Sequence, residues 1–317
     1  MNVAAQNMQE RSSIQRWDAK TLLADKTWRR RIPSAAILEF LALRPTLPNT
    51  TEAFVFDAAR QPALMAYARE IKESIIHGTG VVLSRGLSDL ELSEVEQQIF
   101  YTAFGYALGN PMTQYGLLYP IMDRGVDYTK EAVPVSMTNA ETAFHTDSSS
   151  IDVNPDILGL LCENPSSNGG ESQVVNALAA YEQMQAHAPD AAKILKKSFL
   201  RDVVTPGKDA TRDNLLRNCF PIFSPVKRSE GVHFRYMRYW IEKGHNRAGL
   251  PLGKETLTAM DTLDAFLTSP SNVVSFQLEK GDIIWINNKT IAHNRTAYSD
   301  TEDNIRKLQR MWIETPQ

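Results

Sequence analysis

The spacing of apolar residues changes character near residue 110 of the chain. Before that point, apolar positions recur at the interval of an α-helix and predict helices over 33–44, 60–77 and 89–108. Beyond it, short runs rich in β-branched and aromatic residues are separated by Gly, Pro and polar residues, which predicts many short strands. The predicted strands are 81–83, 133–137, 157–162, 172–175, 199–204, 220–223, 232–240, 273–278, 282–286 and 308–314, with helical inserts at 176–187, 190–198 and 254–268. This pattern is typical of a mainly β sandwich, barrel or jelly roll decorated by helices.

No segment has the composition of a linker, a repeat or a low-complexity tract, so one catalytic domain is predicted over 1–317. Residues 1–60 are expected to form an N-terminal extension, and 79–315 the β-rich core. Two long polar stretches, 112–131 and 205–218, show no clear periodicity. Because long stretches of this kind in compact domains often serve a function, 112–131 is predicted to be a lid over a binding site. An ordinary surface loop is the alternative.

Charge and composition narrow the classes of partner. The chain has 34 basic and 37 acidic residues, a formal net charge of −3, which argues against binding nucleic acid through bulk positive charge. No apolar run approaches the ~20 residues that span a bilayer, and the start of the chain has no secretion-signal pattern. Two cysteines cannot build a disulfide framework and fit a reducing, cytoplasmic setting. We therefore expect a small-molecule ligand and no membrane or nucleic-acid partner. A monomer and a homo-oligomer are both compatible with this composition.

A histidine and a carboxylate two residues apart give the first indication of chemistry. Of the six histidines, only His145 is followed at that spacing by a carboxylate, Asp147. On a strand, a period of two places both side chains on one face, where they can bind one metal ion. The third ligand has to come from elsewhere, and His293, after an apolar strand and a turn, is the best candidate. Two histidines and one carboxylate form the facial arrangement that holds non-haem Fe(II) and leaves positions open.

Two arginines near the C-terminus, Arg306 and Arg310, lie four positions apart. This spacing keeps both on one face of a strand or a helical turn. Because a guanidinium binds a carboxylate through two parallel hydrogen bonds, such a pair could hold an acidic co-substrate or substrate. Taken alone, the pair also fits a solvated or ion-paired surface.

The ordered combination of these motifs resembles a known family. Phe144-His-Thr-Asp147, Gly169-Gly-Glu-Ser172, the run from Gly281-Asp to His293-Asn-Arg-Thr-Ala-Tyr298, and Arg306-x-x-x-Arg310 are similar to the taurine dioxygenase/clavaminate synthase-like oxygenases. Residues 79–86 also resemble the first core strand of that family, and 220–236 a later hairpin. The resemblance covers about 79–315.

Fold, cofactors and residue roles follow from this resemblance as expectations. It implies a double-stranded β-helix, or jelly-roll, core and a dioxygenase that uses Fe(II), 2-oxoglutarate and O₂. It implies His145, Asp147 and His293 as iron ligands. It implies that Arg306, preferred over Arg310, binds the distal carboxylate of 2-oxoglutarate together with Ser172. The candidate substrate-binding residues are Arg310, Arg238 and Asn139.

The substrate and the reaction outcome are less constrained than the cofactors. The resemblance favours hydroxylation of a free amino acid or an amino-acid-derived metabolite. Alternatives are a small sulfonate or organic acid as substrate, and desaturation or ring closure as outcome. Asp147 occupies the position that related halogenases leave open for chloride, which disfavours halogenation. A non-catalytic jelly-roll binding protein and a zinc hydrolase with the same three ligands are the alternatives of other classes.

Overall fold

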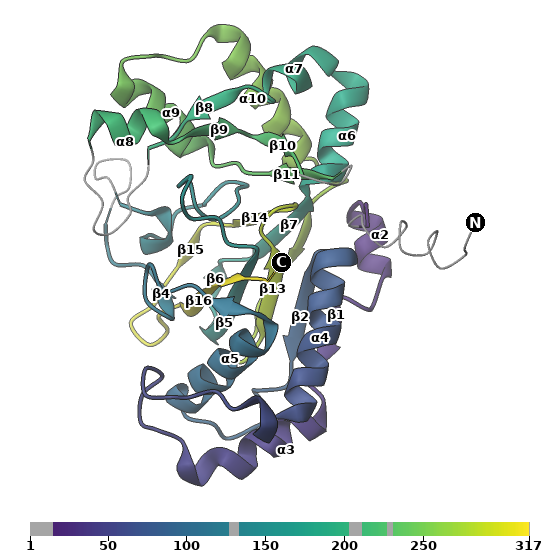
Figure 1. Ribbon diagram of the computed structural model, residues 1–317, viewed down its shortest axis with the longest axis vertical. Helices are drawn as coiled ribbons and strands as arrows, with labels where there is room; N and C mark the ends of the chain where they lie inside the picture. The colour runs from purple at the N-terminus through teal and green to yellow at the C-terminus, as the bar shows by residue number, and fades with distance from the viewer. Residues whose placement is uncertain (1–14, 127–132, 203–210, 227–230, 317) are drawn as a thin grey trace.

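Strands that are distant in sequence form the central sheet of the molecule (Figure 1). The computed structural model describes residues 15–126, 133–202, 211–226 and 231–316. Only β1 and β2 pair in parallel within this sheet, and the other pairs are antiparallel. The strands run in the order β1 (Arg29–Arg31), β2 (Val81–Arg85), β13 (Ile283–Asn287), β5 (Ile157–Asn164), β16 (Lys307–Glu314) and β3 (Asn110–Pro111), and β4 (Tyr119–Ile121) also pairs with β16.

A smaller antiparallel sheet packs against this large one. Its strands run in the order β12 (Val274–Phe276), β7 (Ser172–Asn176) and β14 (Ile291–Arg295). Apolar side chains from both sheets form one buried cluster, which includes Val81, Leu158 and Ile286 of the large sheet and Val174, Val274 and Ile291 of the small one. Two sheets that enclose a shared core are the jelly-roll arrangement that the sequence predicted.

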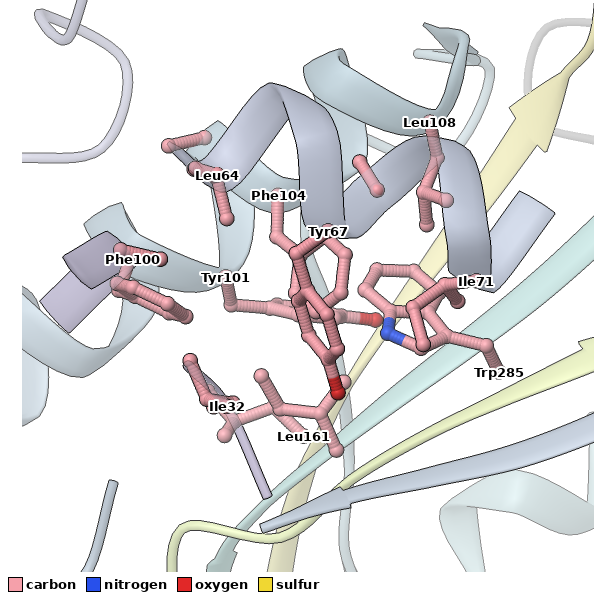
Figure 2. Close-up of a cluster of buried hydrophobic side chains, with 14 of the residues drawn as sticks. Ile32, Leu64, Tyr67, Ile71, Phe100, Tyr101, Phe104, Leu108, Leu161 and Trp285 are labelled. Atoms are coloured by element: carbon pink, nitrogen blue, oxygen red, sulfur yellow. The ribbon is translucent and has the colours of Figure 1, made fainter. Parts of the chain in front are cut away.

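Two helices, α4 (Pro62–His77) and α5 (Glu94–Leu108), cover the other face of the large sheet, and α3 (Ser34–Leu43) packs against α4. Figure 2 shows how aromatic rings of α4 and α5 converge on Trp285 of β13. The ring centres of Tyr101 and Phe104 lie 5.3 and 5.0 Å from that of Trp285. Because side chains alternate along a strand, Trp285 faces the helices while Ile284 and Ile286 face the smaller sheet.

A second group of helices lies at the opposite end of the molecule in Figure 1. Its apolar faces form a separate buried cluster with the small sheet and a short hairpin. These elements are α6 (Ala177–His187), α7 (Pro189–Ile194), α9 (Arg238–Ala248), α10 (Lys254–Leu267), β10 (Phe223–Pro225) and β11 (Val232–Phe234). The remaining elements are α2 (Ala19–Ala24), α8 (Arg212–Arg217), β6 (Asn168–Gly169), β8 (Ser198–Leu200), β9 (Cys219–Pro221), β15 (Tyr298–Ser299) and the 3₁₀ turns η1 (Arg44–Thr46), η2 (Ala58–Arg60) and η3 (Val135–Met137).

Several predicted strands and helix boundaries were wrong. The helix expected over 190–198 ends at Ile194, and strand β8 begins at Ser198. The strand expected over 232–240 ends at Phe234, and a helix begins at Arg238, because buried residues recur from there at helical spacing. Residues 135–137 form a 3₁₀ turn instead of a strand. Helix α5 begins at Glu94 and not near 89, because Ser93 and the third helical residue cap each other reciprocally.

The structure also places part of the predicted N-terminal extension and of the predicted lid. Trp17, Leu22 and Trp28 join the cluster between the two sheets, and β1 adds an edge strand. Within 112–131, the described residues contribute β4, whereas 127–131 lie outside the described residues, as do 205–210 of the second polar stretch. The lid therefore stays a prediction. A search of the described residues for a helix with the length and apolar character of a membrane span found none.

Close packing around β5 leads to a stability prediction. A Cβ added at Gly159 would lie 2.3 Å from the Trp285 ring and 2.6 Å from the Tyr101 hydroxyl, so Gly159→Ala has to displace the aromatic core. We expect it to lower the free energy of unfolding by about 1–3 kcal/mol, measured by urea denaturation. Gly253→Ala is the control, because nothing lies within 4 Å of its added Cβ. An unchanged stability of Gly159→Ala would contradict the packing described for this core.

Candidate metal centre and cofactor pocket

The structure brings His145, Asp147 and His293 together. One ligand atom from each lies within 4.8 Å of the others, and all three side chains are buried. The Nε2 atoms of the two histidines are each 3.5 Å from Oδ1 of Asp147. Nearly 150 residues separate His293 from the other two, so the fold, and not the local sequence, makes this cluster.

Pairing between two backbone segments sets the position of the histidines. His293 lies on β14, and His145 forms an isolated antiparallel bridge with it. The backbone N–H of His145 donates to the carbonyl of His293 over 3.0 Å, and the reverse bond measures 2.9 Å. The segment around His145 is extended without forming a regular strand, yet alternate side chains still separate: Phe144 joins an apolar cluster while His145 and Asp147 line the cavity. The expected period of two is therefore confirmed.

The Asp147 carboxylate has a different environment at each oxygen. Oδ2 accepts hydrogen bonds from Nε1 of Trp312 over 2.6 Å and from Nη1 of Arg310 over 3.1 Å. Oδ1 faces the two imidazoles. Burial alone would raise the pKa of this carboxyl, but Arg310 and the two histidines outweigh burial and hold the pKa well below its usual range. The group is therefore ionised, as a metal ligand must be.

The histidines are equally suited to binding a metal. Nδ1 of His145 lies 2.8 Å from the carbonyl of Ala143, and this contact orients the ring with Nε2 toward Asp147. Burial, reinforced by the neighbouring His145, lowers the pKa of His293 to about 4. A neutral imidazole presents a free lone pair, which is the form that coordinates a metal.

A cavity of about 140 Å³ adjoins these three residues between the two sheets. Its described lining combines aliphatic and aromatic side chains with neutral polar ones, the two histidines, three arginines and a single carboxylate, that of Asp147. Besides the cluster itself, the lining includes Tyr115, Tyr119, Ile121, Ser136, Ser172, Gln173, Met237, Trp240, Arg295, Arg306, Arg310 and Trp312. This excess of buried positive charge suits anionic ligands.

Arg306 is a buried cation without an ion-pair partner among the described residues. Its side chain lines the cavity, lies over the Tyr298 ring at 5.0 Å, and leaves Nη1 buried without a hydrogen-bond partner. Because a buried guanidinium without a partner is costly, this position suits an anionic ligand. At Gly170, whose φ is +71°, a Cβ would lie 3.1 Å from Nε of Arg306. The absence of a side chain at Gly170 thus leaves room for the guanidinium, and Ser172 lines the same cavity.

The other predicted site residues differ in placement. Arg310 lines the cavity next to Asp147. Arg238 is the first residue of α9 and is not among the lining residues. Its guanidinium donates to Glu242 of α9 and to Asp261 and Asp264 of α10. Asn139 is exposed and also outside the lining. The structure therefore offers no support for Arg238 or Asn139 as substrate-binding residues. For Arg238 the reason is that the segment expected as a strand is a helix at this point.

Among the cavity residues that sequence reasoning missed, Trp312 and Arg295 bear most directly on the ligand cluster. Trp312 lies two residues beyond Arg310 on β16, so alternation along the strand was a usable signal. Arg295 lies two residues beyond His293 on β14, and its guanidinium donates to the carbonyl of Thr138 over 3.0 Å. This bond anchors the segment before the ligand pair to the strand that carries His293.

Comparisons with known proteins agree with this geometry. A family model described as taurine catabolism dioxygenase TauD, TfdA family matches residues 46–312. FR-33289 synthase of Streptomyces rubellomurinus is 27% identical over 252 residues, which are 76% of this chain and 70% of that protein. The range matched by the family model includes all three ligand candidates.

Solved structures show the same fold at lower identity. The non-heme iron oxygenase OrfP in complex with Fe and alpha-ketoglutaric acid aligns with a TM-score of 0.63 at 14% identity, covering 92% of this chain and 95% of that chain. An asparagine oxygenase in complex with Fe(II), 2S,3S-3-hydroxyasparagine and succinate also gives 0.63 at 14% identity, covering 91% and 94%. The predicted jelly-roll fold is confirmed.

A family match over most of the chain, with a histidine–aspartate–histidine cluster at the family's motif positions, leaves one conclusion. The chain belongs to the taurine catabolism dioxygenase TauD, TfdA family and is, as the sequence predicted, a non-haem iron dioxygenase that uses Fe(II), 2-oxoglutarate and O₂.

Proposed function

We propose that this enzyme hydroxylates an unactivated C–H bond of a free amino acid or an amino-acid-derived small metabolite. His145, Asp147 and His293 hold Fe(II), and Arg306 with Ser172 holds the distal carboxylate of 2-oxoglutarate. When bound, iron and 2-oxoglutarate supply the oxidising power: O₂ is consumed, 2-oxoglutarate becomes succinate and CO₂, and one oxygen atom enters the substrate. The observation that carries the proposal is the buried ligand cluster together with an unpaired guanidinium in the same cavity.

The protein's own contribution is position and the exclusion of water. Trp312 and Arg310 occupy Oδ2 of Asp147, which leaves Oδ1 as the oxygen directed at the two imidazoles. A ligand set of three neighbouring donors on one side leaves the opposite side accessible from the cavity. The apolar and aromatic lining keeps that side poor in water, which strengthens the electrostatic contacts made there.

Arg310 is the residue that we propose for the acid group of the substrate. It lines the cavity beside the ligand cluster, and among the described residues its side chain forms a hydrogen bond only with Asp147. Its guanidinium also lies over the rings of Tyr119 at 4.7 Å and Trp312 at 4.6 Å, which fix its position. A carboxylate or sulfonate on the substrate would complete its hydrogen bonds. This feature also fits the alternative of a small sulfonate or organic acid.

The solved neighbours support an amino-acid substrate, and the cavity restricts which kind. Besides the hydroxyasparagine complex, OrfP was solved with Fe, succinate and (3S)-hydroxy-L-Arg. In the present chain, the described lining contains no carboxylate except Asp147, so it offers no acidic partner to a substrate guanidinium. We therefore propose a substrate that carries an acid group and a neutral side chain.

A substrate panel read by succinate release tests this proposal. We expect Fe(II)-, 2-oxoglutarate- and O₂-dependent succinate with a neutral amino acid or derivative, and at least about tenfold less with L-arginine. The product should gain one oxygen atom by mass spectrometry; loss of two hydrogens would indicate desaturation instead. Turnover of taurine or organic acids alone would favour the alternative substrate class. No succinate with any compound would favour a binding protein, and activity with zinc but not iron would favour a hydrolase.

A further inference from the structure

The side chain of Asn288 binds the backbone of Asp147 on both sides. Asn288 is fully buried in the turn between β13 and β14. Its Oδ1 accepts the N–H of Asp147 over 2.7 Å, and its Nδ2 donates to the carbonyl of Asp147 over 3.0 Å. Nδ2 also donates to the carbonyl of Pro155 over 3.2 Å. One amide group therefore satisfies both backbone groups of the only carboxylate in the candidate metal cluster.

Asp147 needs such a partner because it lies outside any regular strand. The last ladder contact of its segment is the bridge between His145 and His293. Directly after Asp147 the chain turns, with Ser148 in the left-handed region at a φ of 68°. Buried backbone N–H and carbonyl groups require hydrogen-bond partners. Beyond the end of the ladder, the Asn288 side chain provides them for Asp147. The amide thus continues the pairing that holds this segment to the β14 side of the cavity.

We infer that Asn288 is a positioning residue for the metal centre. It lies five residues before His293 in the same hairpin, so its amide links the segment that carries Asp147 to the strand that carries His293. The inference rests on the proposed function, in which both residues bind iron. Without the amide, Asp147 keeps its contacts to Trp312 and Arg310 but loses the constraint on its backbone, so the direction of Oδ1 toward the imidazoles is no longer fixed.

The adjacent residue, Asn287, provides a matched control. It is also buried, but its side chain contacts other parts of the fold: Nδ2 donates to the carbonyl of Ile75 in α4 over 3.0 Å, and Oδ1 accepts the N–H of Lys289 over 2.9 Å. Asn287→Ala should therefore destabilise the protein without disturbing the ligand cluster. If Asn288 acts on the metal centre specifically, the Asn288 variant should lose metal affinity and the Asn287 variant should not.

The experiment measures Mn(II) binding to the full-length protein by isothermal titration calorimetry. Mn(II) stands in for Fe(II) because it binds similar ligands and is not oxidised in air. We expect Asn288→Ala to weaken binding by about 10–100-fold, the usual cost of losing an outer-shell partner of a metal ligand. Asn287→Ala should weaken it by less than about tenfold, even if its melting temperature falls as far as that of Asn288→Ala.

Asn288→Asp is a second variant of nearly unchanged size, in case the alanine variant does not fold. It retains an acceptor for the Asp147 N–H but turns its second oxygen toward the carbonyls of Asp147 and Pro155. We expect weaker Mn(II) binding despite the added negative charge. Wild-type affinity in either folded Asn288 variant, or an equal loss in Asn287→Ala, would overturn the inference. If the wild-type protein itself bound no Mn(II), the metal-ligand assignment would fail instead.

Discussion

Asp147→Ala is expected to abolish substrate-dependent succinate release. The substitution removes one of the three proposed metal donors and leaves the hydrogen-bond donors of Trp312 and Arg310 without their shared acceptor. The loss should exceed the roughly 100-fold that removal of an outer-shell partner causes, because a ligand itself is missing. The measurement is the initial rate of succinate formation in buffer replete with Fe(II) and 2-oxoglutarate. His145→Ala and His293→Ala should behave in the same way.

The control for this result is a second aspartate of the same region. Asp156 pairs with Lys289 over 3.0 Å and accepts the backbone N–H of Thr315 over 2.8 Å, but it is not part of the described cavity lining. Asp156→Ala should lower stability while activity measured well below its melting temperature is retained. Full activity of Asp147→Ala, with Asp156→Ala equally active, would refute the ligand assignment.

The ligand candidates could be found from the sequence because their chemistry is carried by residue type and spacing. A period of two holds for any extended segment, so the prediction for His145 and Asp147 did not depend on a regular strand. The residues that orient them could not be found in this way. Alternation along β16 could have placed Trp312 in the cavity, but not in contact with Asp147. The contacts of Trp312 and Asn288 with Asp147 span 165 and 141 positions respectively, and a single sequence contains no signal for such a contact.

The same distinction explains which parts of the fold were predictable. Strands β5 and β13 are continuous apolar runs because both of their faces are buried, and they were expected nearly where they lie. The error over 232–240 arose where alternating aromatic and basic residues pass directly into a helix. Trp240 and Ile241 fit either period, and only the later buried residues, Gly244 and Ala248, favour the helical one. The residues near 238 therefore do not show that a helix begins there, because the helical spacing becomes visible only farther along the chain.

The choice between Arg306 and Arg310 also required the structure. The two residues lie four apart, the predicted one-face spacing holds, and both line the cavity, so spacing alone cannot separate their roles. The surroundings of the two side chains do distinguish them. Arg310 contacts Asp147 and is enclosed by aromatic rings, whereas Arg306 lies beside the Gly-Gly pair with an unpaired nitrogen. A free anion has more to gain at Arg306, which makes it the better partner for 2-oxoglutarate.

Arg306→Ala is therefore expected to raise the KM for 2-oxoglutarate by about 10-fold to 150-fold. This range corresponds to the 1.5–3 kcal/mol attributed to hydrogen bonds with charged groups. The measurement is the rate of succinate formation as a function of 2-oxoglutarate concentration at saturating Fe(II). Arg306→Lys keeps the charge but not the planar pair of donors, so its KM for 2-oxoglutarate should lie between that of the wild-type enzyme and that of Arg306→Ala.

Arg310→Ala is the comparison variant for Arg306→Ala. Because Arg310 contacts Asp147 and not the Gly-Gly pair, its loss should raise the KM for the organic substrate more than that for 2-oxoglutarate. The two variants would then affect two different ligands of one cavity, although their side chains originate four residues apart on the same chain segment. If Arg306→Ala left the 2-oxoglutarate requirement unchanged while Arg310→Ala raised it, the distal carboxylate would belong to Arg310, and the unpaired nitrogen of Arg306 would need another anion.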